Sequence, residues 1–271
     1  MVSRLTVPRV TLLVHAVTPS AIAASRSMIT RARLDGVAVA IPLHHVLPGP
    51  RLPSGHMSVD SLWLPTAPGR VLESLRQRRL VESATTFTTP RLVVPWAVAT
   101  GRGASRQATA GLIAALSRQV TTGRITLAVR PDHRHPIRDQ LLAMTALRRL
   151  AEEWDYDLAL DLSGTRNGPW EAEAALHRMM PRLTTIRLGR VTGNGWGRST
   201  DPRMASRVLS AARDVAFAGT IVIEPAGWPL SLGPDKTHAA AAMAAMVRDR
   251  FAGDRGVWPP SRSSEPSRWV V

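Results

Sequence analysis

The sequence predicts an α/β protein and, within that class, a single (β/α)8 barrel. Short β-branched runs alternate with longer amphipathic segments, which is the pattern of a parallel sheet covered by helices. Eight such runs follow one another, and the chain of 271 residues is close to the roughly 250 residues of a typical barrel. An open doubly wound sheet is the alternative, but no glycine-rich nucleotide-binding turn follows the first run.

The predicted strands are short and rich in Val, Ile and Leu. They cover residues 9–15, 36–44, 59–65, 91–96, 124–131, 158–164, 184–190 and 219–225. Three of the helices between them are expected to begin at prolines, because the first turn of a helix does not need the N–H that proline lacks. These prolines are Pro136, Pro169 and Pro202, and further helices are expected near 19–34, 68–85, 104–122 and 235–251.

Two segments depart from the ideal barrel. Residues 45–58 contain three prolines and two glycines, so the second helix is expected to be missing or irregular. Residues 253–271 are rich in Pro, Ser and Arg and predict an extended C-terminal tail. The predicted organisation is therefore a barrel over 1–252 followed by an extension over 253–271.

Composition excludes several classes of function. The chain has no cysteine, which removes disulfides, thiolate metal sites and cysteine nucleophiles. The formal net charge is +15, but the positive charge is almost entirely arginine scattered along the chain, so we do not expect a nucleic-acid partner. No apolar run approaches the roughly 20 residues of a membrane span. The short apolar run near the N-terminus makes a better first strand than a secretory signal, which predicts a cytoplasmic protein.

In each of the last four predicted strands a charged residue lies at one of the alternate positions that share the same side of the strand. In a barrel strand, alternate side chains point inward, and active sites lie at the C-terminal strand ends. The large apolar residues of these strands share one parity and are expected to face the helices. The opposite parity carries the four predicted catalytic residues, which should converge at the barrel mouth: Arg130, Asp161, Arg187 and Glu224.

Other residues are candidates for binding a substrate at the same mouth. The first two strands end in histidines of the inward parity, and the fourth ends in a tryptophan that could close the site. The loop after the seventh strand is rich in glycine, so its N–H groups could approach a phosphate beside a neighbouring arginine. The predicted substrate-binding residues are His15, His44, Trp96, Gly195 and Arg198.

The ends of the last four strands, LAVRP, ALDLSG, TIRLGR and VIEP, resemble those of xylose-isomerase-like TIM barrels. That family includes sugar phosphate isomerases, epimerases and AP endonucleases, and it holds a divalent metal with Glu, Asp, His and Glu from strands five to eight. The resemblance places Asp161 and Glu224 at two ligand positions. Arg130 stands where the first Glu is expected, and Arg187 stands in place of the His.

The two arginines change the charge of the centre that the resemblance implies. Family ligands carry a charge of about −3, whereas the four residues of this chain sum to about 0, and a divalent ion would raise that to about +2. Arginine cannot lose its proton to become a ligand. We therefore predict a degenerate metal site without metal or other cofactor, in which crossed Arg–carboxylate bridges occupy the metal position.

The first hypothesis is a metal-independent isomerase, epimerase or related lyase acting on a sugar, a sugar phosphate or another anionic or polyol small molecule. Glu224 would be the base, Asp161, His15 or His44 would supply the second proton, and an arginine would stabilise the enolate. The alternative is a non-catalytic binding or scaffold barrel with a structural plug. A DNA-binding relative of AP endonucleases ranks third, and a homodimer is left open.

Overall fold

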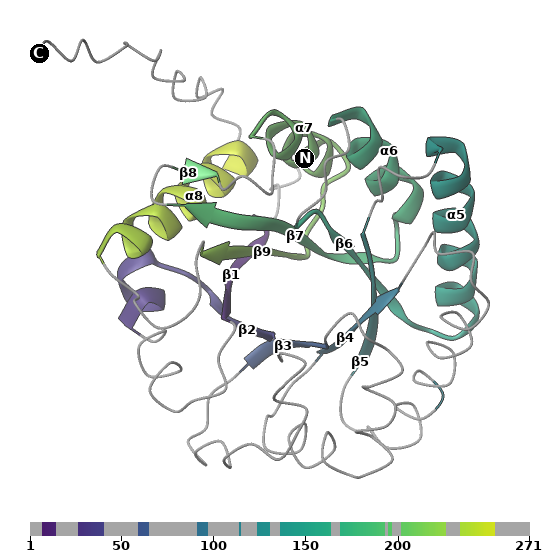
Figure 1. Cartoon of the computed structure of the whole chain (residues 1–271), viewed down its shortest axis with the longest axis horizontal. Coiled ribbons are helices and arrows are strands. Elements are labelled where there is room, and N and C mark those ends of the chain that lie inside the picture. Colours follow the sequence, from purple (N-terminus) through teal and green to yellow (C-terminus); the bar gives the residue numbers. More distant parts are fainter. Residues whose placement is uncertain are drawn as a thin grey trace, which may run out of the picture.

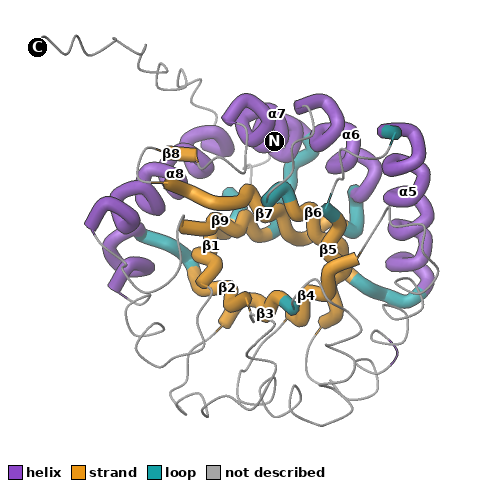
Figure 2. The backbone as a smooth tube through the Cα atoms, in the orientation of Figure 1, coloured by secondary structure: helices purple, strands orange, loops and turns teal. Residues whose placement is uncertain are grey.

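The computed structural model shows a closed barrel of eight parallel strands with helices around it (Figures 1 and 2). It describes residues 7–14, 27–40, 59–64, 91–96, 114, 124–130, 136–163, 169–192, 195–196, 202–225 and 234–252. The barrel strands are β1 (Arg9–Val14), β2 (Gly36–Ala40), β3 (Val59–Trp63), β4 (Arg91–Trp96), β5 (Arg124–Val129), β6 (Asp157–Asp161), β7 (Leu183–Thr192) and β9 (Thr220–Pro225). Each strand pairs in parallel with the next, and β9 pairs with β1 to close the ring. The predicted fold class is confirmed.

Helices cover the outside of the half of the barrel built from β5 to β1 (Figure 1). They are α5 (Ile137–Glu153), α6 (Pro169–Met179), α7 (Pro202–Asp214) and α8 (Pro234–Ala252), and residues 27–32 are also helical. α6 and α7 begin at the predicted prolines, whereas Pro136 is the N-cap of α5. The predicted irregular segment 45–58, the predicted helix 68–85 and the tail 253–271 lie outside the described residues, as does the predicted helix 104–122 apart from Ala114.

Three helices end in the same way before the strand that follows. One residue in the turn that follows each helix has a positive φ, and the amide of the next residue donates to the carbonyl five residues earlier, which is the Schellman arrangement. The residues with positive φ are Arg33 (52°), Asp155 (53°) and Ala216 (53°), and the bonds are Leu34 N–Ile29 O, Tyr156 N–Ala151 O and Phe217 N–Ala212 O. This repeated turn leads the chain from the outer helices back into the barrel.

Inward and outward side chains form two separate apolar clusters. Outward residues such as Leu127, Leu160 and Ile223 pack with helix residues in a large core between strands and helices. Inward residues form a smaller cluster inside the barrel, which contains Leu13, Ala38, Ala40, Trp63, Val93, Ala128, Ala159 and Val222. The predicted parity of the last four strands is therefore confirmed, and it turns their charged residues inward.

One local structure differs from the expectation. The strand predicted over 184–190 extends as β7 to Thr192 and pairs in antiparallel fashion with the short β8 (Gly195–Trp196). Part of the predicted open glycine-rich loop is therefore a β-hairpin. In the described part of the chain, no helix is long and apolar enough to cross a membrane.

Candidate functional site

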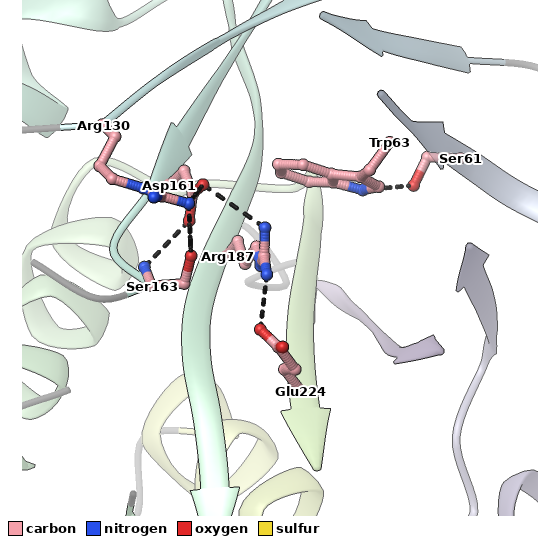
Figure 3. A network of polar contacts seen from close by, with 7 residues as sticks. All are labelled: Ser61, Trp63, Arg130, Asp161, Ser163, Arg187 and Glu224. Atoms are coloured by element: carbon pink, nitrogen blue, oxygen red, sulfur yellow. Dashed lines mark hydrogen bonds and ion pairs between the residues drawn. The ribbon is translucent and has the colours of Figure 1, made fainter. Parts of the chain in front are cut away.

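The ends of β5, β6, β7 and β9 bring the four predicted charged residues into one network (Figure 3). Arg130 directly follows β5, Asp161 ends β6, Arg187 lies within β7, and Glu224 lies near the end of β9. Because parallel strands in a barrel run the same way, these positions all lie toward one mouth. The convergence that the parity predicted is present in the structure.

Arg187 lies between the two carboxylates. Its Nη2 donates to Oε2 of Glu224 at 2.5 Å, and its Nη1 donates to Oδ2 of Asp161 at 3.4 Å. The second arginine, Arg130, donates from Nη2 to the same Oδ2 of Asp161 at 2.7 Å. The two acids are thus neutralised by two guanidiniums, as the crossed-bridge expectation proposed.

Asp161 has hydrogen bonds to both of its oxygens. Oδ1 accepts from the backbone N and the hydroxyl of Ser163, at 2.9 and 2.5 Å, while Oδ2 accepts from both arginines. Ser163 also accepts from Nη2 of Arg130 at 3.0 Å. These donors hold the Asp161 carboxylate in one orientation. Asp161 thereby orients both arginines, and its predicted part in proton transfer stays a prediction.

Trp63 contacts Arg187 from the opposite side of the barrel (Figure 3). The guanidinium carbon lies 5.2 Å from the centre of the indole ring, a cation–π contact. Nε1 of Trp63 donates to the hydroxyl of Ser61 at 3.1 Å, which orients the ring. Neither residue was predicted for the site, although both lie at positions of the third strand that face the barrel interior.

The two arginines differ in exposure. Arg187 is 9% exposed, and its Nε is buried without a hydrogen-bond partner among the described residues. The side chain of Arg130 is 42% exposed and uses only Nη2 for its contacts with described residues. Arg187 is therefore the buried arginine of the site, and Arg130 is the one whose Nε and Nη1 make no hydrogen bond to a described residue.

Burial alone would lower the pKa of Arg187, but the charges of Asp161 and Glu224 and the hydrogen bond to Glu224 outweigh it and raise the pKa above its ordinary value. The guanidinium therefore stays protonated at any pH at which the protein works. It supplies a fixed positive charge and takes no part in proton transfer.

The remaining predicted site residues are placed differently. Trp96 shares its parity with Leu92 and Val94 and packs against the core between strands and helices, so its place in the substrate site stays a prediction. Gly195 lies in β8, paired with Thr192. His15, His44 and Arg198 lie outside the described residues.

The described residues do not suit a divalent cation. They contain no group of three or more His, Cys, Asp or Glu side chains arranged to hold a metal ion. The two acids of the network already share a protonated guanidinium, and both oxygens of Asp161 are occupied. The donor set of this centre does not fit the metal that the resemblance implies.

Comparisons with known proteins agree with the fold. No family model and no curated protein sequence matches the chain. A D-allulose 3-epimerase from Methylomonas sp., solved with D-allulose, is similar in structure with a TM-score of 0.62 and 12% identity, over 91% of this chain and 98% of that one. The 3-keto-D-glucoside 4-epimerase YcjR from E. coli, in its apo form, gives a TM-score of 0.52 and 16% identity, over 89% of this chain and 99% of that one.

These similarities, together with the closed parallel barrel, define the class. The protein has a xylose-isomerase-like TIM-barrel fold, and its structural neighbours include sugar epimerases. At such low identity the likeness concerns the fold alone.

Proposed function

We propose that the protein catalyses proton transfer next to the carbonyl of a sugar-like small molecule, as an isomerase or epimerase that works without a divalent metal. The observation that carries the proposal is the buried guanidinium of Arg187 bonded to Glu224 and Asp161. It supplies positive charge where the related fold is expected to hold a cation. The sugar substrates named for the structural neighbours support the choice of substrate class.

In this proposal Glu224 is the base. The neighbouring guanidinium favours its ionised form, which can accept a proton from a carbon acid. The carbanion that results is an enolate, whose negative oxygen needs fixed donors. Arg130 has an exposed side chain and uses only Nη2 in its contacts with described residues, so it is the residue that donates to the enolate or to an anionic substituent of the substrate.

A second candidate is a binding or scaffold barrel without catalysis. It is favoured by the same network, because the four charges neutralise one another without any ligand. In that case the network has a structural role and fills the mouth of the barrel, and the protein converts no substrate.

Deuterium exchange tests the proposal. We expect the wild-type protein, incubated in D2O with a panel of ketoses, 3-keto-glycosides and sugar phosphates, to incorporate deuterium at the carbon next to the carbonyl of at least one of them, as read by NMR. A chelator should leave the rate unchanged. Absence of exchange throughout the panel would favour the binding barrel, and exchange abolished by the chelator would contradict metal independence.

A further inference from the structure

The interior of the barrel contains a layer made only of hydroxyl side chains. In a β/α barrel the inward residues of alternate strands lie at one height in layers of four, since each strand is offset by about one residue from its neighbour. Following the observed register around the ring from β1 to β3, β5 and β7 and back to β1 gives one such layer. Its members are Thr11, Ser61, Thr126 and Thr185.

These four side chains are buried, with exposures of 0 to 1%. The Oγ1 atoms of Thr11, Thr126 and Thr185 have no hydrogen-bond partner among the described residues. Ser61 accepts from Trp63 Nε1 and keeps its own proton to donate. The layer therefore presents several unused donors and acceptors to the barrel axis.

A dry layer of this kind is unfavourable. A buried hydroxyl without a partner costs about 1–3 kcal/mol, and valine has the same shape as threonine without that cost. Buried polar groups in native proteins almost always have a partner, which is an ordered water molecule when no protein group is in reach. Three threonines with unsatisfied hydroxyls in one layer therefore indicate a ligand that can both donate and accept.

Below the layer, β2 carries a glycine at an inward position. Gly36 has no side chain at the point where β2 faces Thr11 and Asp60: a Cβ there would lie 3.6 Å from Thr11 Cγ2 and 3.7 Å from Asp60 Cβ. Asp60 binds Arg9 through Oδ1 at 2.7 Å, while its Oδ2 is buried without a partner in the described chain. Asp60 thus adds a further buried polar group close to Gly36.

Above the layer the barrel is apolar. The next four inward residues are Ala38, Val93, Ala159 and Val222, and the layer above them contains Trp63 and Arg187. The apolar layer lies between the three threonines and the charged network at the mouth, and Ser61 is linked to that network through Trp63 Nε1. We propose that the hydroxyl layer is a buried binding site for ordered water on the barrel axis, held by Thr11, Thr126 and Thr185 below the candidate active site.

Valine substitutions test this inference through the sign of the change in Tm. If water binds to the hydroxyls, Thr126→Val and Thr185→Val each remove a partner of that water and should lower Tm by about 2–4 °C. If the layer is dry, each substitution removes an unsatisfied group and raises Tm. An unchanged or raised Tm in both variants therefore overturns the proposal.

Thr145→Val serves as the control. The Thr145 hydroxyl donates to the carbonyl of Leu141 within α5, and valine and threonine have similar helix propensities, so little change in Tm is expected. A high-resolution crystal structure gives an independent readout. Electron density at about 2.7–3.0 Å from Oγ1 of Thr126 and Thr185 supports the site, and its absence from all three threonines overturns it.

Discussion

Arg187→Met is expected to lower the free energy of unfolding by about 3–5 kcal/mol at neutral pH, because it leaves two acids buried without their shared partner. Asp161 and Glu224 are 6% and 1% exposed, so water cannot replace the guanidinium. Methionine keeps much of the volume under the Trp63 ring, which limits the loss of packing. Denaturant unfolding of wild type and variant, monitored by circular dichroism, measures the difference.

The pH dependence of this loss has a definite sign. In the variant Asp161 keeps Arg130, but Glu224 loses its bond to the guanidinium. Burial then disfavours the charge of Glu224, so it binds a proton more readily in the folded than in the unfolded state. The folded variant therefore gains stability relative to wild type as the pH falls, and the loss should shrink toward acid pH. A loss that does not depend on pH would show that packing, and not charge, causes it.

Arg182→Met is the matched control. Arg182 forms an ion pair of 2.7 Å with Asp155, but the Asp155 side chain is 81% exposed. Exposed pairs contribute about 0–1 kcal/mol. If Arg187→Met costs no more than this control, Arg187 does not neutralise the buried acids as described.

Glu224→Gln is expected to lower the rate of deuterium exchange by about 10²–10⁴-fold, because the amide cannot accept the substrate proton. Glutamine keeps the shape of the side chain and can still accept a hydrogen bond from Arg187, so the variant should fold. The exchange rate on the substrate found for wild type is the measurement. Retention of full activity would exclude Glu224 as the base.

A substitution on the protein surface serves as the control for Glu224→Gln. Glu152→Gln removes an exposed carboxylate that pairs with Arg148 at 3.5 Å near the C-terminal end of α5, outside the barrel. It should leave the exchange rate unchanged. A similar fall in both variants would point to a general loss of folded protein.

The fold and the charged network could be predicted because both follow from simple periodicities. Parallel barrel strands alternate sides with a period of two, so the apolar face of β5, β6, β7 and β9 determines which residues face inward. Charges on the inward face must meet near the mouth. The structure confirms this for Arg130, Asp161, Arg187 and Glu224.

The same rule, applied to every strand, would have found more of the site. In β3 the outward residues Leu62 and Leu64 leave Ser61 and Trp63 facing inward. In β4 Trp96 shares the outward parity of Leu92 and Val94. The sequence contained both signals.

Other features could not be read from strand patterns alone. The glycine-rich stretch after β7 fits an open anion-binding loop as well as a hairpin, and the pairing of Gly195 with Thr192 decides between them. The hydroxyl layer depends on register around the whole ring, because its members come from strands that are far apart in the sequence. The difference in exposure between Arg130 and Arg187 likewise depends on three-dimensional packing.

Titration of the purified wild-type protein with Mn²⁺, followed by calorimetry, tests most directly whether a guanidinium has taken the place of the cation. With Arg187 bonded to both Glu224 and Asp161, we predict no stoichiometric binding and no rise in Tm. One tightly bound equivalent of metal, lost in both Asp161→Asn and Glu224→Gln, would contradict the account.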